Sequence, residues 1–358
     1  MAKNHFYVII IRMKVFLGMS GGVDSAVSAY LLQQQGHEVV GVYMKNWSKN
    51  LPGMKCPWAE DLADAKRVAV KLGIDFRVFD FETEYKQKVV DYMLAEYQKG
   101  NTPNPDIMCN QEIKFKLFAE TAFGQGAEAI ATGHYAKTRG DELLMAEDEN
   151  KDQTYFLYRI TPGVIAKTIF PVGDMLKPEV KKLAEEIGLA VAHKPESMGV
   201  CFVGEANMKD FLAEFIETKP GKIIELETGN ELGVHDGAIF YTLGQRHGLG
   251  LTQGLPYYVV KKDMDANIVY VSQNLNARKL WSDQVKLRDV ILRAPAEGKI
   301  MARIRHRAPL VSATYDSSTQ IVHFAEEQKS LTPGQSVVFY RDDVCLGGGI
   351  IELCPSRT

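Results

Sequence analysis

The feature that most constrains this chain is a glycine-rich loop near its amino terminus, residues 20–25, with the sequence SGGVDS. The apolar residues 15–19 before the loop predict a buried strand, and Val23, Val27 and Leu31 after it recur at helical spacing. The loop therefore connects a strand to the amino terminus of a helix. Glycines let the backbone approach a ligand closely, and the helix dipole favours an anion there. We expect this loop to bind phosphate groups.

The loop lacks the lysine that a Walker-type loop carries after its second glycine. It resembles instead the pyrophosphate-binding loop of the N-type ATP pyrophosphatases, which cleave ATP to AMP and pyrophosphate while adenylating an oxygen. That resemblance implies that Asp24 faces Mg²⁺ and that Ser20 and Ser25 face the pyrophosphate. The alternative is a glycine-rich turn without a ligand.

The first part of the chain alternates strands with helices. The pattern predicts strands at 39–44, 74–81 and 129–132, and helices at 58–72, 84–97 and 113–123. This alternation is typical of an α/β fold with a doubly wound parallel sheet, whose ligands lie beyond the carboxyl ends of the strands. The glycine-rich loop, Met44 and residues 132–135 should therefore share one crevice.

A chain of 358 residues exceeds the size of a single core, so we expect more than one domain. Helices are predicted at 178–188 and 206–216, followed by short strands at 222–226, 238–241, 257–260 and 268–271. From about residue 284 the pattern is all β and predicts a small barrel. We expect a catalytic domain over 1–208, a small central domain over 209–280 and a C-terminal β-barrel over 281–358.

Net charge and cysteine content limit how the chain could bind nucleic acid and in which cellular compartment it could work. The net charge is −3, so any contact with nucleic acid must come from local basic patches. Five cysteines at no metal-ligand spacing argue against a disulfide framework and a zinc site, and favour the reducing cytoplasm. No apolar run approaches the length of a membrane span. Met13 opens the first strand, so residues 1–12 are a possible upstream extension.

One cysteine stands in a rigid polar loop. Cys109 lies near the end of residues 101–110, which contain two prolines, just ahead of the helix predicted from Ile113. A nearby helix amino terminus and the charge of Lys114 and Lys116 favour a thiolate, and Asp106 could transfer a proton. The alternative is a buried cysteine in an ordinary loop. Taken alone, Cys201, between glycines, is typical of a core cysteine, and Cys56, Cys345 and Cys354 give weaker signals.

A basic segment lies in the predicted barrel. In residues 302–307, strand alternation would place Arg303, Arg305 and Arg307 on one face and His306 on the other. Three guanidinium groups in a row suit phosphates and stacked bases. The alternative is a solvated strand face, and His306 could join the arginines only at a bend or a strand end.

Several motifs then occur in a fixed order: GMSGGVDS, TPNPDIMCNQEIKF, ATGHYA, NKDQTYFLY, GVCFVGE, TLGQRHGLG and TPGQSVVFY. Together they resemble the tRNA-specific 2-thiouridylases, bacterial enzymes that thiolate the wobble uridine of tRNAs for Lys, Glu and Gln. The resemblance runs from about Lys14 to the end of the chain. It implies a pyrophosphatase-type catalytic domain, a small central domain and a C-terminal barrel, which agrees with the pattern of predicted elements.

The resemblance also implies roles for individual residues. Cys109 matches the nucleophile, Cys201 the cysteine that carries a persulfide, and Asp24 faces the metal. ATP would contact Gly18, Met19, Ser20, Gly21, Gly22, Val23, Asp24, Ser25, Met44 and Gly133. The target base would meet Asn104, Pro105 and Asp106, and other parts of the tRNA would meet His134, Lys151, Asp152, Gln153, Arg305, His306 and Gln335.

The implied reaction uses ATP and Mg²⁺ to adenylate oxygen 2 of the uracil, which makes carbon 2 electrophilic. A persulfide on Cys201, received from a cysteine desulfurase or a relay protein, supplies the sulfur. The persulfide sulfur either attacks carbon 2 itself or is released as sulfide when Cys109 attacks the Cys201 persulfide, which closes a Cys109–Cys201 disulfide that a reductant must reopen. A monomer is expected. Two other classes stay open: a small-molecule amidoligase on the same ATP fold, and an RNA-binding protein whose nucleotide loop no longer works.

Overall fold

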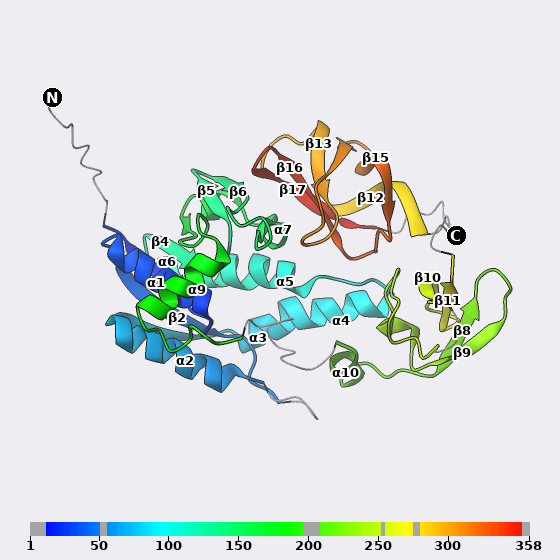
Figure 1. Ribbon diagram of the computed structural model, residues 1–358, viewed down its shortest axis with the longest axis horizontal. Helices are drawn as coiled ribbons and strands as arrows, with labels where there is room; N and C mark the ends of the chain where they lie inside the picture. Colours follow the sequence, from blue (N-terminus) through cyan, green and yellow to red (C-terminus); the bar gives the residue numbers. More distant parts are fainter. Residues whose placement is uncertain (1–11, 51–55, 196–207, 252–254, 275–279, 353–358) are drawn as a thin grey trace.

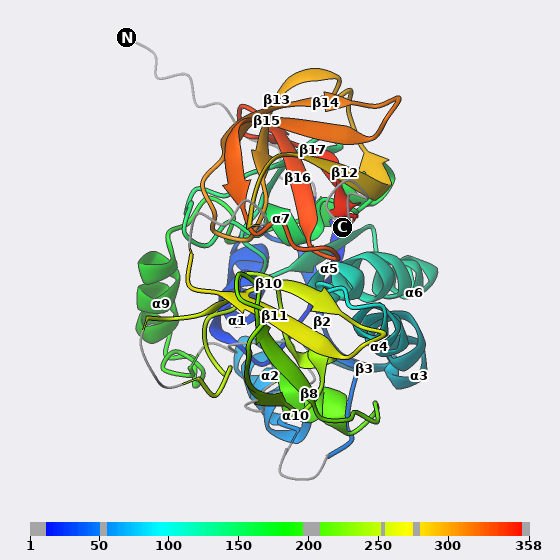
Figure 2. The same ribbon diagram turned by 90° about the vertical axis from the view of Figure 1, so that its right-hand side faces the viewer.

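A computed structural model describes residues 12–50, 56–195, 208–251, 255–274 and 280–352 of the chain. Figure 1 shows an α/β body at the amino-terminal end, a small β structure in the middle of the chain and a β-barrel at the carboxyl-terminal end. Turned by 90°, the barrel lies above the small β structure of the middle part (Figure 2). The predicted three-part fold class is confirmed.

The α/β body is built on a parallel sheet of five strands in the order β3-β2-β1-β4-β7. The strands are β1 (Lys14–Gly18), β2 (Glu38–Lys45), β3 (Asp75–Asp80), β4 (Ala129–Thr132) and β7 (Thr168–Ile169). The chain runs outward from β1 to β3 and then returns to β4 on the other side of β1. This reversal is a topological switch point, and it places the loops after β1 and β4 side by side.

Helices cover both faces of this sheet. β1 sends Val15 and Leu17 into the core under α1 (Val23–Gln34), while Phe16 enters the core on the opposite face. The first face also carries α2 (Trp58–Leu72) and α9 (Lys177–Glu186). α2 has the predicted bounds, and Gly73 ends it with a φ of +65°, a left-handed turn that glycine adopts without strain.

The other face carries two long helical segments. The first combines α3 (Glu82–Tyr85), a π-helical stretch η1 (Lys86–Val90) and α4 (Asp91–Gln98). The second combines α5 (Pro105–Met108), the π-helical stretch η2 (Cys109–Leu117) and α6 (Phe118–Gly124). The helix predicted from Ile113 therefore starts eight residues too late, because Asn104 already caps it: its side-chain oxygen accepts hydrogen bonds from the backbone N–H groups of Asp106 and Ile107.

The central part folds around a four-stranded sheet in the order β10-β11-β8-β9. Its strands are β8 (Gly221–Glu225), β9 (Glu231–His235), β10 (Tyr258–Asp263) and β11 (Ile268–Ser272). The strand predicted at 238–241 is wrong. That segment forms the 3₁₀ turn η3 (Ala238–Phe240), because the N–H of Ala238 donates to the side chain of Asn267 instead of to a neighbouring strand. Of the helix predicted at 206–216, the structure describes residues 208–216, where α10 (Met208–Ala213) ends before the predicted end.

The carboxyl-terminal part is a closed barrel of six strands, since β12 pairs with both β15 and β17. The strands are β12 (Trp281–Leu292), β13 (Gly298–Arg303), β14 (Val311–Asp316), β15 (Ile321–Lys329), β16 (Ser336–Arg341) and β17 (Val344–Ile351). A hairpin of the α/β body, β5 (Lys137–Arg139) and β6 (Glu142–Leu144), adds to β17. Backbone hydrogen bonds thus join the barrel directly to the catalytic part. No helix among the described residues is long and apolar enough to cross a membrane.

Candidate active site

The loop after β1 is folded on itself by its own serines. The N–H of Ser20 donates to Oγ of Ser25 at 3.2 Å, and the N–H of Gly22 donates to Oγ of Ser20 at 3.3 Å. Gly21 has a φ of +78°, and a Cβ built on it would lie 2.4 Å from the backbone oxygen of Asp61. Only glycine satisfies both conditions, so this loop keeps a compact backbone at the amino terminus of α1.

The loop after β4 comes into direct contact with this cradle. A Cβ on Gly133 would lie 2.7 Å from the backbone nitrogen of Ser25, so the two loops touch without room for a side chain. On the other side, a Cβ on Gly18 would lie 2.8 Å from Cε of Met44. The structure therefore brings together the three segments that the sequence assigns to one crevice.

Asp24 at the start of α1 has two partners that sequence reasoning missed. Nζ of Lys177 lies 2.6 Å from its Oδ1, and the hydroxyl of Tyr135 donates to the same oxygen at 3.0 Å. The Lys177 side chain is only 7% exposed, whereas Asp24 is 31% exposed. No local signal could reveal this pair, because the two residues are 153 positions apart.

A second lysine closes the other side of the cradle. Nζ of Lys194 donates to the backbone oxygen of Gly21 at 3.2 Å and contacts Asp61 and Asp64, each at 2.6 Å. Burial alone would raise the pKa of Asp64, but hydrogen bonds from Lys194 and Arg67 outweigh it and hold that pKa below its usual value. Lys194 thus pairs with two carboxylates and stabilises the loop through its hydrogen bond to Gly21.

The second group of candidate residues opens the helical segment that begins at Asn104. Burial raises the pKa of Asp106 above its ordinary value, and the nearby charge of Lys114 partly offsets this. A carboxyl group with a raised pKa suits proton transfer near neutral pH. Cys109 is buried and lies inside the helical segment, in its second turn, and not in the loop ahead of it as expected.

Lys114 connects this group to the loop after β4. Its Nζ lies 3.4 Å from Nε2 of His134, whose Nδ1 lies 2.7 Å from Oγ1 of Thr132. Burial, with the charge of Lys114, lowers the pKa of His134 well below its usual value, so this imidazole is neutral. Because His134 follows Gly133, a short chain of contacts links Asp106 to the phosphate cradle.

The segment 151–153 departs from expectation. Asp152 is almost fully buried, and its Oδ2 accepts hydrogen bonds from Arg303 at 2.6 Å and from Thr154 at 2.8 Å. It has no surface to offer to RNA in this structure and instead positions the elements around it. Gln153 exchanges hydrogen bonds with the backbone of Tyr135, the residue that holds Asp24. Lys151 stays partly exposed at the edge of this segment.

The expected row of three arginines is wrong. β13 ends at Arg303, which is buried against Asp152, whereas Arg305 and Arg307 lie in the following turn and are exposed. Arg307 has a φ of +62°, which confirms that the extended alternation has stopped. His306 therefore meets the condition set for it, a strand end. Its ring packs 4.5 Å from that of Phe156, and burial lowers its pKa to about 4.

The loop ahead of Asn104 is held by the barrel. Nε2 of Gln335 donates to the backbone oxygen of Thr102 at 2.7 Å, and the N–H of Thr102 donates to Pro333 at 2.8 Å. A hollow of about 310 Å³ opens at this junction, where all three parts of the chain meet. It is lined by Thr102, Thr242, Leu243, Gly244, Gln245, Arg305, Thr332 and Gln335.

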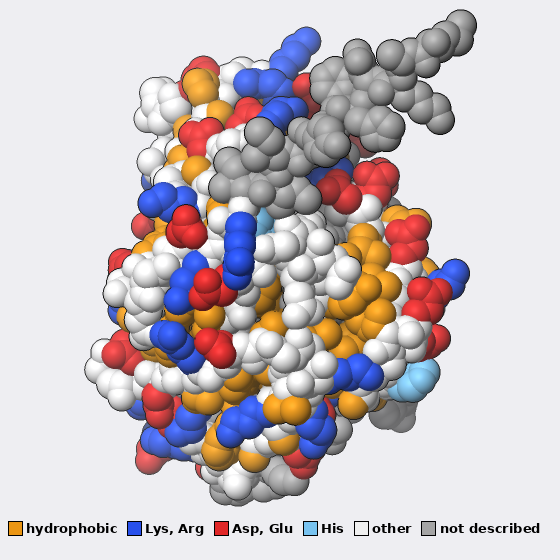
Figure 3. Space-filling model, turned by 90° about the vertical axis from the view of Figure 1, so that its left-hand side faces the viewer, with side chains coloured by type: hydrophobic (Ala, Val, Ile, Leu, Met, Phe, Trp, Pro, Cys, Tyr) orange, Lys and Arg blue, Asp and Glu red, His pale blue; other side chains and the backbone are white. Residues whose placement is uncertain are grey.

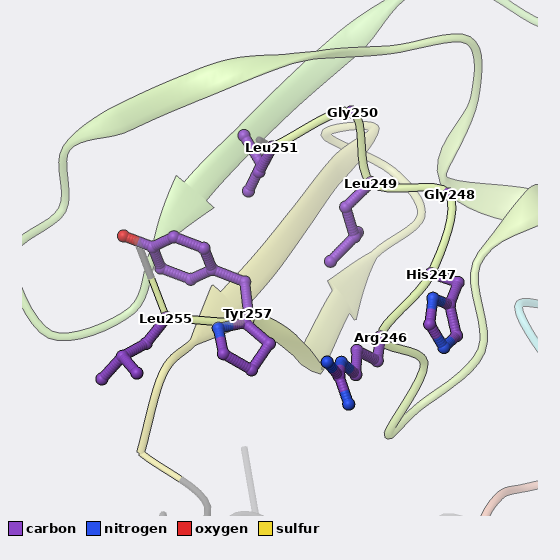
Figure 4. A pocket seen from close by; sticks show the side chains of 9 residues that line it. Arg246, His247, Gly248, Leu249, Gly250, Leu251, Leu255 and Tyr257 are labelled. Atoms are coloured by element: carbon purple, nitrogen blue, oxygen red, sulfur yellow. The ribbon is translucent and has the colours of Figure 1, made fainter. Parts of the chain in front are cut away.

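A second hollow, of about 340 Å³, belongs to the central part alone. Figure 4 shows Leu249 and Leu251 beside the ring of Tyr257, with Arg246 and His247 on the chain that leads to them. None of the residues expected at the active site lines it. Cys201, expected to carry the persulfide, lies outside the residues that the structure describes.

The buried pair of Arg303 and Asp152 makes a stability prediction. Arg303→Met leaves a buried carboxylate without its cation, which should lower the free energy of unfolding by about 3 to 5 kcal/mol. Arg307→Met is the matched control, since this arginine is exposed, and it should change the free energy by less than about 0.5 kcal/mol. Urea unfolding of both variants measures the difference, and equal stabilities would show that the pair contributes nothing.

The face at the end that holds the α/β body carries mixed charges. Figure 3, a view from the end that holds the amino-terminal α/β body, shows lysines and arginines interspersed with aspartates and glutamates, with apolar areas between them. This face presents no field of one sign, in agreement with the small net charge. Contact with a nucleic acid therefore depends on individual basic residues.

Comparison with known proteins gives a consistent result. Three family models match successive parts of the chain, described as "tRNA methyl transferase HUP domain" over residues 13–205, "tRNA methyl transferase PRC-barrel domain" over 209–273 and "Aminomethyltransferase beta-barrel domain" over 284–351. Among solved structures, an NMN synthetase from Francisella tularensis is 18% identical with a TM-score of 0.35, covering 56% of this chain and 72% of that one. A 4-thiouridine synthetase in complex with RNA and ATP is 20% identical with a TM-score of 0.37, covering 56% and 50%. Scores this low carry no argument.

Relatives along the whole chain are far more similar. The protein named tRNA-specific 2-thiouridylase MnmA from Listeria welshimeri is 45% identical over 353 residues, which cover 95% of each chain. The protein of the same name from Pseudoalteromonas translucida is 47% identical over 358 residues, covering 95% of this chain and 98% of that one. Since these alignments leave almost nothing of either chain unmatched, this chain belongs to the family of tRNA-specific 2-thiouridylases.

Proposed function

We propose that this chain is an ATP-dependent tRNA-uridine 2-sulfurtransferase that thiolates the wobble uridine of tRNAs for Lys, Glu and Gln. One observation carries the proposal: a partly buried acid, Asp106, and a buried thiol, Cys109, open a helix whose Lys114 lies 3.4 Å from His134, in the loop that touches the phosphate cradle at Gly133. Adenylation requires the α-phosphate of ATP to lie beside the oxygen that attacks it. The contact between this helix and the loop after β4 supports placing the base and ATP next to each other.

The family-model descriptions name methyl transfer, whereas the relatives are named for thiolation. A methyl donor without phosphates would not need the folded loop at Gly21 or its contact with Gly133. A nucleotide whose pyrophosphate must be bound and released does need them. The cradle therefore favours thiolation.

The first step joins ATP to the base. Oxygen 2 of the uracil attacks the α-phosphorus, the bond to the β-phosphate oxygen breaks, and pyrophosphate leaves. Asp106, whose pKa burial raises, accepts the proton from nitrogen 3, which makes oxygen 2 a better nucleophile. The product carries AMP on oxygen 2, and AMP is a far better leaving group than the oxygen alone.

The residues of the cradle fit a magnesium ion. Mg²⁺ prefers one or two carboxylates together with substrate phosphates, and Asp24 offers a partly exposed carboxylate at the amino terminus of α1. No cluster of three or more potential ligands occurs in the part of the chain that the structure describes, which agrees with an ion held mainly by phosphates. When bound, the ion neutralises charge on the transferring phosphates. The chain's own part is to hold Asp24 through Tyr135 and to keep the loop closed through Lys194.

The second step replaces oxygen by sulfur. Cys201 carries a persulfide received from a cysteine desulfurase or a relay protein. In one route its terminal sulfur attacks carbon 2, AMP leaves with the former oxygen 2, and Cys109 then attacks Sγ of Cys201 and releases thiouridine. In the other route Cys109 first releases sulfide, which attacks carbon 2. Both routes end in a Cys109–Cys201 disulfide, which a thiol reductant reopens.

The test is the exchange of labelled pyrophosphate into ATP. We expect exchange only when an unmodified substrate tRNA is present. Exchange that needs a small molecule and no tRNA would identify an amidoligase instead. Absence of exchange under all conditions, with tRNA still bound, would identify an RNA-binding protein with a vestigial loop.

The two exposed arginines after β13 should contribute phosphate contacts. Arg305→Gln with Arg307→Gln should weaken tRNA binding and lower its dependence on salt by roughly two units in the log–log slope, about one per lost contact. Binding titrations at several salt concentrations measure this slope. An unchanged slope would show that the turn is merely solvated.

Further contacts belong to the same proposal. Asn104 and Pro105 meet the target base, and Lys151, His306 and Gln335 meet other parts of the tRNA. Because Gln335 already donates to Thr102, its contact with RNA requires that bond to be shared or released. We place the enzyme in the cytoplasm as a monomer, with domain boundaries near residues 208 and 280.

A further inference from the structure

We propose that Lys177 is a phosphate-binding residue of the ATP site, and that it pairs with Asp24 only while the nucleotide is absent. The inference rests on the proposed use of ATP and adds a residue to that site. It starts from the contact of 2.6 Å between Nζ of Lys177 and Oδ1 of Asp24, beside the cradle. A Walker-type loop carries its lysine within the loop itself, and this loop has none. The structure supplies an ammonium group from α9 instead.

The position of Lys177 is unusual for a structural lysine. It is the first residue of α9, where the helix dipole disfavours a cation, and its side chain is almost fully buried. Its backbone is fixed, because its N–H donates to Oδ2 of the buried Asp148 at 2.9 Å. The side chain of Lys177 therefore extends from a fixed backbone position and places its ammonium group beside Asp24. A site that receives an anion would explain both the burial and the unfavourable helix end.

The two lysines around the cradle differ in what holds them. Lys194 is shared by Asp61 and Asp64 and stays engaged whatever enters the site. The partners of Lys177 include the carboxylate assigned to the metal. When that carboxylate turns to a dication, repulsion between the two cations favours moving the ammonium group onto a phosphate oxygen. The lysine thus offsets the charge of Asp24 in the empty site and the charge of the β- and γ-phosphates in the filled one.

Calorimetric titration of the full chain tests this role. The probes are AMP and an ATP analogue with nitrogen between the β- and γ-phosphorus atoms, each in Mg²⁺ and in EDTA. Lys177→Met should weaken binding of the analogue by roughly 10- to 100-fold, the usual worth of a hydrogen bond to a charged group, and leave the affinity for AMP unchanged. Lys182→Met, an exposed lysine on the same helix, is the control and should bind both as the unsubstituted chain does.

A purely structural role predicts a different pattern. If Lys177 only neutralises Asp24, then Lys177→Met should have no effect on analogue binding once Asp24→Asn is present. We expect the loss to persist in that background, in which neither of the two side chains carries a charge. Failure of the unsubstituted chain to bind the analogue would overturn the proposed function together with this inference. Normal binding by the unsubstituted chain and by Lys177→Met would overturn the inference alone.

Discussion

Asp24→Ala should abolish the cleavage of ATP, with a loss on the order of 100-fold or more, and leave tRNA binding close to that of the unsubstituted chain. The carboxylate lies at the amino terminus of α1, where it is partly exposed and held by Tyr135 and Lys177. Phosphoryl and adenylyl transfer depend on the placement of charge around the phosphates, so its loss removes most of the catalysis. The proposed tRNA contacts lie on other elements, among them Asn104 and Pro105 and the turn after β13.

Two measurements and one further variant make this prediction sharp. Pyrophosphate release in the presence of tRNA reports the chemistry, and filter binding reports the tRNA complex. Asp24→Ala also removes the carboxylate that contacts the buried Lys177, so Asp24→Asn, which keeps the shape of the side chain, separates the loss of charge from any loosening of the loop. Release of pyrophosphate at the normal rate from Asp24→Asn would refute the assignment of Asp24.

The sequence predicts most of the α/β body because the signals are local. β2, β4 and α2 follow directly from an apolar run or a helical period, and the bounds of α2 agree to the residue. The alternation of strands and helices predicts the doubly wound parallel sheet. The start of the helix at Asn104 is hard to predict because proline and asparagine are typical of loops, although both also favour a helix amino terminus.

The contacts that complete the site could not be predicted in this way. Lys177 reaches Asp24 across 153 positions, and Arg303 reaches Asp152 across 151. No sequence periodicity and no motif spacing indicates either ion pair. Strand alternation failed at Arg303 because a buried carboxylate from another part of the chain captures the first arginine and the strand ends there. Tertiary electrostatics, which no local pattern encodes, decides which charged residues are free to meet a ligand.

Cys201→Ser should lose the ability to accept labelled sulfur from a cysteine desulfurase, whereas Cys109→Ser should accept the sulfur and fail to transfer it. Both variants should form 2-thiouridine at a rate lower by several orders of magnitude. Cys109 is buried in η2, one turn after Asp106, so it can react only with a partner that is delivered to this helix. A disulfide between the two cysteines requires Cα atoms within roughly 7 Å in at least one state.

The design of this experiment separates the two thiols from the ATP site. Pyrophosphate release should persist in both variants, because neither sulfur takes part in the cleavage of ATP, and its loss would point to a misfolded site. Cys345→Ser is the matched control: this cysteine is also buried, but it lies in β17, where the hairpin β5–β6 joins the barrel. It should accept and transfer sulfur as the unsubstituted chain does. If Cys201→Ser still forms 2-thiouridine at the normal rate, Cys201 is only a core cysteine, and the sulfur must reach carbon 2 by a route that involves Cys109 alone.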